Sequence, residues 1–157
     1  MIVIDTNVVS ELMRASPDRA VLAWFAGHTA DTLFLTAISE AELCTGAAIL
    51  PAGHRRDRLV GAIDAMIDQD FSGRILPFDS PAARSYAEIA AARRTAGKPI
   101  MDADCQIAAI SRACGAAIAT RNVKDFEGCG IEVIYRLCCT NPVRGIHLVN
   151  ERDSWRG

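Results

Sequence analysis

The sequence predicts a single α/β domain of three layers (α/β/α), with helices on both faces of a central, mostly parallel β-sheet. Short apolar runs alternate along the chain with longer segments in which apolar residues recur every three or four positions. This alternation is typical of strands and helices that follow one another in α/β proteins. The chain has 157 residues, 50% of them apolar, which is enough for one well-buried core and short for two. We therefore predict one domain over residues 1–157.

Short apolar runs mark the predicted strands, which are Ile2–Ile4, Leu33–Ala37, Ile75–Phe78, Ala116–Thr120 and Glu132–Ile134. The segments between them have helical spacing, and the predicted helices are Pro17–Gly27, Ser39–Leu50, Arg55–Asp70, Ser80–Ala96 and Asp102–Ala113. Two of these helices start at a Ser-Pro pair, where serine caps the first turn and proline fits it. Trp24 and Phe25, on the first of them, are expected to pack in the core or at a dimer interface.

Composition and charge exclude several classes of protein. No stretch approaches the roughly 18 to 20 uninterrupted apolar residues of a membrane span, and the first residues lack the basic and apolar regions of a signal peptide. We therefore expect a cytoplasmic protein. The net charge of −2 argues against a protein that coats nucleic acid, because such domains are strongly basic. Any contact with nucleic acid is expected at a local basic patch.

The cysteines and histidines do not form a recognisable metal or catalytic set. The cysteines show no C-x-x-C pair and no zinc-type spacing with histidine, and they are Cys44, Cys105, Cys114, Cys129, Cys138 and Cys139. Most lie in apolar segments, so we expect free, buried thiols. The histidines His28, His54 and His147 lie apart from the acidic motifs described next, which excludes a Ser/His/Asp or Cys/His arrangement.

Acidic residues follow the predicted strands at the edge where an α/β sheet binds ligands. Asp5 comes directly after the first strand, Asp125 lies a few residues beyond the fourth, and Glu42 lies near the start of the helix after the second. Ligands of open parallel sheets bind outside the carboxyl ends of the strands, where loops and helix N-termini converge. The sequence therefore predicts that these three carboxylates share one edge.

A fourth carboxylate comes from the helix predicted over Asp102–Ala113. At 100° per residue, Ala103, Ile107, Ile110 and Cys114 form its apolar stripe. Asp104 lies beside that stripe, whereas Asp102 points the opposite way and is better explained as a helix cap or first-turn residue. Helical geometry does not decide between Glu40 and Glu42, because both flank the apolar stripe of their helix.

Four segments together resemble one family, the PIN-domain ribonucleases, and within it the toxins of VapBC-type toxin–antitoxin pairs, particularly the Fit-like branch. The segments are Ile4-Asp5-Thr6-Asn7-Val8-Val9-Ser10-Glu11-Leu12, Ser39-Glu40-Ala41-Glu42-Leu43 with Gly46, Asp104-Cys105-Gln106-Ile107-Ala108-Ala109-Ile110, and Thr120-Arg121-Asn122 with Asp125-Phe126. They occur in the order of the family and cover residues 2 to about 134. Each segment alone is a weak signal, and the combination is specific. The resemblance selects Glu42 over Glu40 and agrees with the choice of Asp104.

The resemblance implies a metal-dependent endoribonuclease toxin with an acidic catalytic cluster, Asp5, Glu42, Asp104 and Asp125. Phosphodiester hydrolysis needs an activated water and relief of negative charge at phosphorus, and Mg²⁺ or Mn²⁺ held by oxygen ligands supplies both. Asp5 and Asp104 are expected to be metal ligands, Asp125 an outer or second-metal ligand, and Glu42 a ligand or the group that orients the water.

Other polar residues of these segments are expected to support the cluster. Thr6, Asn7, Thr120 and Asn122 would hydrogen-bond phosphate, metal-bound water or the carboxylates. Arg121 and Lys124 flank Asp125 and would guide the RNA backbone, and Arg93, Arg94 and Lys98 form a second candidate patch. The basic run at residues 55–58 is interpreted as a solvated helix face.

The resemblance also implies partners: an RNA substrate, a cognate antitoxin whose basic side chain blocks the carboxylates, and a second copy of the chain in a homodimer. A catalytically silent binding module of the same fold is the alternative function. Phosphotransfer domains also place Asp after a first strand, but Asn7 stands where the haloacid-dehalogenase type needs a second Asp, and the acidic pair of a receiver is missing. The core is expected over residues 1–134. The tail, 135–157, departs from the family pattern, because Tyr135–Thr140 precedes the expected Asn-Pro ending.

Overall fold

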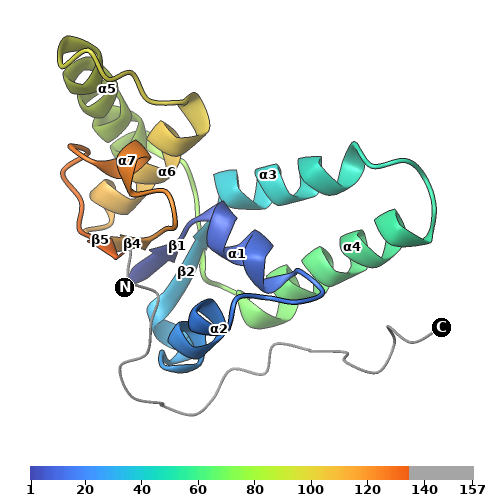
Figure 1. The fold of residues 1–157 in the computed structure, drawn as a ribbon. Helices are drawn as coiled ribbons and strands as arrows, with labels where there is room; N and C mark the ends of the chain where they lie inside the picture. The colour runs from blue at the N-terminus through green and yellow to red at the C-terminus, as the bar shows by residue number, and fades with distance from the viewer. Residues whose placement is uncertain (135–157) are drawn as a thin grey trace.

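The computed structural model describes residues 1–134, and the atypical tail predicted at 135–157 lies outside the described residues. Its strands are β1 (Ile2–Ile4), β2 (Leu33–Thr36), β3 (Ile75–Leu76), β4 (Ala117–Ala119) and β5 (Val133–Ile134). They form one sheet in the order β3-β2-β1-β4-β5, in which every neighbouring pair is parallel (Figure 1). The predicted α/β class with a parallel sheet is confirmed, and each predicted strand is present, some of them shorter than expected.

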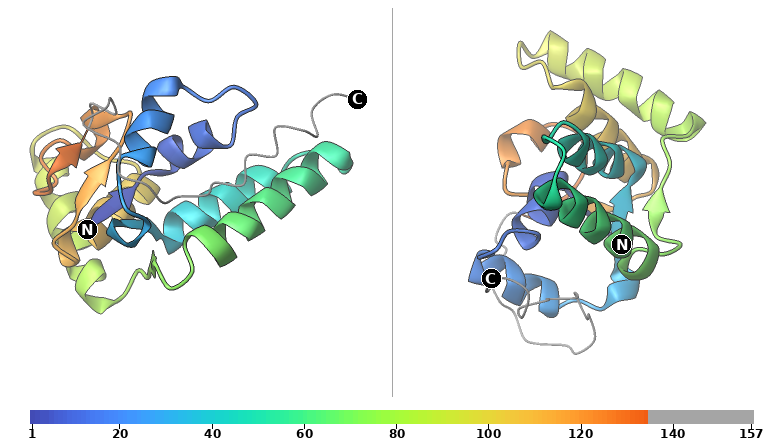
Figure 2. Two further views of the ribbon diagram at one scale, coloured as in Figure 1. Left: turned by 90° about the horizontal axis from the view of Figure 1, so that it is seen from below. Right: turned by 90° about the vertical axis from the view of Figure 1, so that its right-hand side faces the viewer.

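Helices cover both faces of this sheet. They are α1 (Thr6–Leu12), α2 (Arg19–Ala26), α3 (Ala37–Ala48), α4 (His54–Ala65), α5 (Ser80–Thr95), α6 (Asp102–Ala113) and α7 (Val123–Phe126), with a 3-10 turn at Ala30–Thr32 and a π-helical turn at Met66–Asp70. Figure 2 shows α3 and α4 as an antiparallel pair that projects from the body of the molecule. No helix among residues 1–134 is long and apolar enough to cross a membrane.

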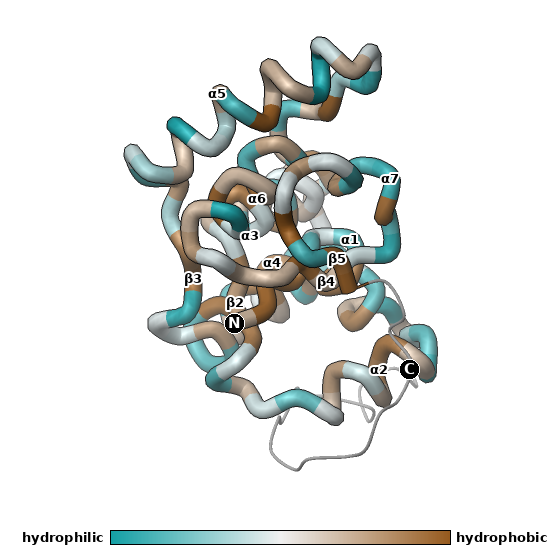
Figure 3. Tube along the Cα trace, turned by 90° about the vertical axis from the view of Figure 1, so that its left-hand side faces the viewer, coloured by the Kyte–Doolittle hydropathy of each residue, from teal (hydrophilic) through white to brown (hydrophobic). Residues whose placement is uncertain are grey.

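The core is divided into two clusters by the sheet. Val3 and Ile4, neighbours on β1, are both fully buried and point to opposite faces. The cluster around Ile4 packs against α1, α2, α3 and α4, and the cluster around Val3 packs against α5, α6 and α7. Figure 3 shows hydrophobic segments, coloured brown, at β2, β4 and β5. These two clusters confirm the three-layer arrangement.

Most differences from the predicted helices lie at helix ends. The helix predicted from Pro17 begins at Arg19 because Asp18 is its N-cap, whose carboxylate accepts a hydrogen bond of 2.8 Å from the amide of Ala20. The single helix predicted over Arg55–Asp70 is α4 followed by the π-helical turn. Neither α1 nor the four-residue α7 was predicted, since short helices give too few turns for a periodic pattern.

Two expectations about buried side chains have different outcomes. Trp24 and Phe25 lie in the core, 5% and 3% exposed, as predicted. The cysteines of residues 1–134 are free, as predicted, but only Cys105 and Cys129 are buried. Burial was predicted wrongly for Cys44 and Cys114, because the former lies on the outer side of α3 and the latter ends α6 at the surface. The remaining pair, Cys138 and Cys139, lies outside the described residues.

Arg93 is buried, although the sequence suggested it for a surface patch with Arg94 and Lys98. Its side chain donates hydrogen bonds to the carbonyl oxygens of Glu127, at 2.7 Å, and Lys124, at 3.5 Å. Arg94 and Lys98 are exposed. Arg93 therefore ties α5 to the segment after α7 and is not part of a basic surface.

The contrast between Arg93 and Arg94 gives a prediction for stability. Arg93→Ala is expected to lower the free energy of unfolding by about 2 to 3 kcal/mol, because it removes buried packing and the hydrogen bonds that the guanidinium donates to the carbonyl oxygens of Glu127 and Lys124. Arg94→Ala, one residue further on the exposed side of α5, is the matched control and is expected to change it by less than about 0.5 kcal/mol. Urea denaturation measures both, and equal losses in the two variants would contradict the role given to Arg93.

Candidate active site

Asp5 is placed at the centre of the sheet edge by the pairing of β1 with β4. Its amide donates to the carbonyl of Ala119 at 3.0 Å, which continues the ladder by one residue and brings Asp5 beside Thr120. Asp5 stands at the N-cap of α1, yet its side chain makes no capping hydrogen bond. Instead, one carboxylate oxygen, Oδ2, accepts from Thr120 Oγ1 at 2.6 Å and from Asn7 Nδ2 at 2.5 Å. The carboxylate, only 4% exposed, is thus turned toward the strand ends.

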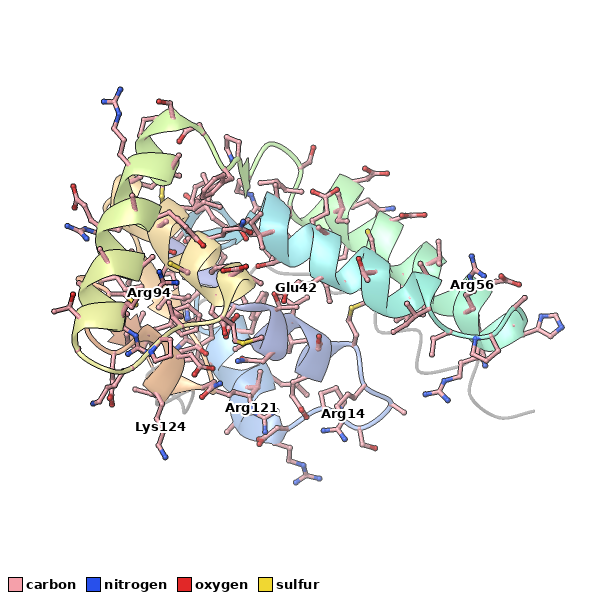
Figure 4. The ribbon with its side chains drawn as sticks, turned by 90° about the horizontal axis from the view of Figure 1, so that it is seen from above. Arg14, Glu42, Arg56, Arg94, Arg121 and Lys124 are labelled. Atoms are coloured by element: carbon pink, nitrogen blue, oxygen red, sulfur yellow. The ribbon has the colours of Figure 1, made fainter. Side chains whose placement is uncertain are left out.

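Three more carboxylates reach the same edge from three different helices. Glu42, on α3, accepts from Thr6 Oγ1 at 2.6 Å, which connects α3 to the start of α1. Asp125, on α7, accepts a hydrogen bond from the side-chain amide of Asn122. Asp104 lies half-buried in the first turn of α6. Figure 4 shows Glu42 near the centre of the molecule, far from Arg56 at the tip of the α3–α4 hairpin.

The electrostatics show that these four groups act on one another. Burial raises the pKa of Asp104 to about 6, and the charges of Asp125, Asp5 and Glu42 contribute to the rise. Burial also raises the pKa of Asp5, aided by the charges of Glu42 and Asp125 and opposed by hydrogen bonds from Thr120 and the amide of Thr6. Without a cation, Asp104 is therefore expected to keep its proton in mildly acidic solution, up to a pH of about 6.

Contacts distinguish Glu42 from Glu40, which the sequence left open, and agree with the choice of Asp104 over Asp102. Glu42, rather than Glu40, is bound by Thr6 and raises the pKa of Asp5 and Asp104. Asp102 is exposed and accepts a hydrogen bond of 3.0 Å from the hydroxyl of Tyr86, on α5. Asp102 is therefore a first-turn residue of α6 that contacts its neighbouring helix, as the helical geometry indicated.

The expected supporting residues all hydrogen-bond within this cluster. Thr6 binds Glu42, Asn122 binds Asp125, and Asn7 and Thr120 bind Asp5 and each other, at 3.1 Å between Asn7 Nδ2 and Thr120 Oγ1. The donors that hold the carboxylates here are neutral hydroxyl and amide groups. They fix the carboxylates in place without cancelling their charge.

The two basic residues expected near the site differ in their surroundings. Lys124 is exposed and points outward in Figure 4. Arg121, whose side chain is 45% exposed, forms a 2.6 Å ion pair with Glu11. The sequence reasoning did not single out Glu11, although it lies four residues after Asn7 in the first matching segment and therefore on the same face of α1.

The donor set suits a hydrated divalent cation. Within residues 1–134, no three His, Cys, Asp or Glu side chains converge closely enough to enclose a metal ion by themselves. Mg²⁺, however, keeps several of its waters and is bound through one or two carboxylates, and Mn²⁺ also prefers oxygen ligands. Buried Asp5 and half-buried Asp104, whose pKa values are raised partly by neighbouring negative charge, fit such an ion.

Comparison with known families matches residues 2–127 to the PIN domain. This chain belongs to the PIN-domain family. It is 48% identical over 134 residues to the VapC ribonuclease Y4jK of Sinorhizobium fredii, covering 85% of this chain and 96% of that protein. It is 39% identical over 133 residues to the toxin FitB of Neisseria gonorrhoeae, with the same coverage of 85% and 96%. The resemblance found in the sequence is confirmed.

Solved structures support the assignment of this PIN domain. FitAcB from Neisseria gonorrhoeae superposes with a TM-score of 0.80 at 39% identity, covering 85% of this chain and 96% of the solved chain. FitAB bound to an IR36 DNA fragment gives a TM-score of 0.83 at 36% identity, covering 90% and 99%. The phosphotransfer folds considered from the sequence are thereby set aside.

The raised pKa of Asp104 predicts a pH-dependent stability of the metal-free PIN domain. A carboxyl whose folded pKa, about 6, exceeds its ordinary value of 3.8 stabilises the fold at low pH and loses that contribution as pH rises through about 6. Asp104→Asn is therefore expected to stabilise the protein in EDTA at pH 7.5, by about 1 kcal/mol after screening of a half-exposed group, and by less at pH 5.

Thermal or urea unfolding at the two pH values measures this difference. Asp102→Asn, in the same helical turn but outside the cluster, is the control and should give no gain at pH 7.5. An equal gain from Asp104→Asn at pH 5 and pH 7.5 would contradict the electrostatic origin of the shift.

Proposed function

We propose that this PIN domain is a Mg²⁺- or Mn²⁺-dependent endoribonuclease that acts as the toxin of a toxin–antitoxin pair. The observation that carries the proposal is that Asp5, Glu42, Asp104 and Asp125 lie at one edge of the sheet, where burial and the charges of the other three carboxylates raise the pKa of Asp104. The 48% identity to a protein named VapC ribonuclease supports the same reaction. All four acidic positions of the family pattern are filled, which argues against a catalytically silent member.

In this mechanism Asp5 and Asp104 would hold the cation, Asp125 would be an outer or second-metal ligand, and Glu42 would be a further ligand or the group that orients the attacking water. A bound divalent ion supplies an activated water and relief of negative charge at the phosphorus. Thr120 and Asn7 fix the orientation of Asp5, Thr6 fixes Glu42, and Asn122 fixes Asp125. Because these donors are neutral, the full carboxylate charge remains available to the ion.

The substrate is expected to approach across cations at the rim of the cluster. Lys124 is exposed on α7, one residue before Asp125, and the partly exposed Arg121 lies in the loop between β4 and α7. Arg94 and Lys98 offer two more exposed cations near the end of α5. With a net charge of −2, the protein depends on such local charges to bind an RNA backbone.

Cleavage of a mixed RNA pool by purified, partner-free protein tests the proposal. Mg²⁺ or Mn²⁺ is expected to support cleavage and EDTA to abolish it, and Asp5→Ala is expected to reduce the rate by at least about a hundredfold, because the most buried carboxylate of the cluster is lost. A variant Asp5→Ala that is folded and fully active would refute the assignment, and folded wild-type protein that binds RNA without cleaving it would favour a binding module.

The same assay distinguishes the two glutamates of α3. Glu42→Gln is expected to lower the cleavage rate about a hundredfold or more, while Glu40→Gln, two residues away, stays within about twofold of the wild type. Equal effects of the two substitutions would mean that the contact between Thr6 and Glu42 does not mark a catalytic group.

We also propose an antitoxin as the partner of this toxin and a homodimer as its assembly, since similar structures include FitAcB and FitAB. A guanidinium or ammonium group entering the cluster would replace the charge that the metal supplies. The complex co-purified with its antitoxin is therefore expected to cleave RNA at less than about a tenth of the rate of the free protein. Equal rates for complex and free toxin would refute inhibition at this site.

A further inference from the structure

Glu11 is a buried carboxylate that lies outside the acidic cluster. It is 5% exposed and belongs to α1, the helix that starts after Asp5. The charges that raise the pKa of Asp5 and Asp104 come from the other members of the cluster and do not include Glu11. Hydrogen bonds from Arg14, the amide of Asp18 and Arg121 lower the pKa of Glu11. It is therefore an ionised group with its own partners and not a fifth member of the site.

The partners of Glu11 come from two parts of the chain. Oε2 accepts from the guanidinium of Arg121 at 2.6 Å and from that of Arg14 at 3.0 Å, and Oε1 accepts from the amide of Asp18 at 3.0 Å. Arg14 and Asp18 are local, in the connection between α1 and α2. Arg121 is 110 positions away, in the loop that links β4 to α7. Figure 4 shows Arg14 and Arg121 on the same side of the molecule.

Arg121 is attached to α1 at two points. Its backbone amide donates to Asn7 Oδ1 at 3.1 Å, while its side chain binds Glu11. Asn7 and Glu11 are four residues apart and share one face of α1. This face therefore holds both the main chain and the side chain of one loop residue.

The residues on either side of Arg121 orient two carboxylates of the cluster. Thr120 donates to Asp5 Oδ2 at 2.6 Å, and Asn122 donates to Asp125. The amide of Asn122 also donates to Thr120 Oγ1 at 2.9 Å, so the three residues form one connected segment. Movement of Arg121 would displace donors of both Asp5 and Asp125.

From these contacts we propose that Glu11 is a positioning residue of the nuclease: by holding Arg121 on α1, it sets the 120–122 loop that orients Asp5 and Asp125. It contacts neither cation nor substrate. The effect of Glu11 on catalysis rests on the proposed function. Its effect on the loop rests on the hydrogen bonds alone. The competing explanation is that Glu11 has a structural role only, in which it joins α1 to α2 through Arg14 and the amide of Asp18.

Glu11→Gln and Arg14→Met form the decisive pair. Glu11→Gln keeps an oxygen for the amide of Asp18 and loses the charge that holds Arg121. Arg14→Met removes the other guanidinium from the same oxygen. The side chain of Arg14 is 67% exposed, and its ion pair is with Glu11. Glu11→Gln is expected to lower kcat about tenfold and change KM by less than about twofold, as for other groups that orient metal ligands. Arg14→Met is expected to leave both unchanged.

Hydrogen exchange supplies a readout that needs no activity. The amides of Arg121 and Asn122 are expected to exchange at least about tenfold faster in Glu11→Gln than in the wild type, because loss of the clamp lets the loop open. Arg14→Met should leave this exchange unchanged. In an Arg121→Met background, Glu11→Gln should cause little further loss of kcat, since its partner is already gone.

The outcomes distinguish failure of the role proposed for Glu11 from failure of the proposed nuclease function. Faster exchange with unchanged kcat would overturn a positioning role, as would a change confined to KM or equal effects of Glu11→Gln and Arg14→Met. Unchanged exchange at residues 121 and 122 in Glu11→Gln would overturn the clamp itself. If wild-type protein shows no metal-dependent cleavage, the proposed function fails, and the exchange data alone decide whether Glu11 holds the loop.

Discussion

The parallel pairing of β1 with β4 buries the carboxylate of Asp5, where water has little access to it. Extending the ladder by one residue, through the hydrogen bond from the amide of Asp5 to Ala119, takes Asp5 into the interior at the end of the central strand. Burial raises the pKa of that group, and three other carboxylates arrive at the same edge. Such a concentration of negative charge is unfavourable, and the hydrogen bonds and ion pairs around this edge offset part of its cost.

The hydrogen-bond donors inside the cluster are neutral, and the cations lie outside it. Thr120, Asn7, Thr6 and Asn122 satisfy carboxylate oxygens without neutralising them. The nearest arginine of the β4–α7 loop, Arg121, is instead paired with Glu11 on the outer part of α1. A guanidinium inside the cluster would lower the pKa values and remove the affinity for a second cation. The arrangement therefore keeps the edge attractive to a divalent ion.

The sequence predicted the layers and the sheet because these depend on patterns of whole segments. Short apolar runs and helical spacing identify buried strands and long helices, and Asp104 was separated from Asp102 by the direction of one helical stripe. The sequence did not predict α1 or α7, whose four to seven residues are too few for a periodic signal. Arg93 was assigned to the surface because nothing local shows that the carbonyl oxygens it binds, more than 30 positions away, lie beside it.

In the candidate site, too, some features could be predicted from local sequence patterns and others depend on long-range packing. Asp5, Glu42, Asp104 and Asp125 could be predicted because each follows a strand or faces a helix stripe, and the family pattern then selected Glu42 where spacing alone did not. The ion pair between Glu11 and Arg121 could not be predicted, since it joins residues 110 positions apart and is defined only when β1 and β4 lie side by side. Local patterns thus indicate which acidic groups come to the edge of the sheet, whereas long-range packing determines how those groups are held.

Repulsion within the cluster also links stability, cation binding and inhibition. Burial, together with the charges of Asp125, Asp5 and Glu42, raises the pKa of Asp104 to about 6. The repulsion among these charges favours a cation at this position, whether a proton, a divalent metal ion or the basic side chain of another protein. These three compete for the same carboxylates, because each relieves the same repulsion. A metal ion with open coordination positions leaves room for water and phosphate, while a proton or a guanidinium does not supply an activated water. Under the proposed function, the acidic edge that serves catalysis is therefore also the feature that a basic side chain can block.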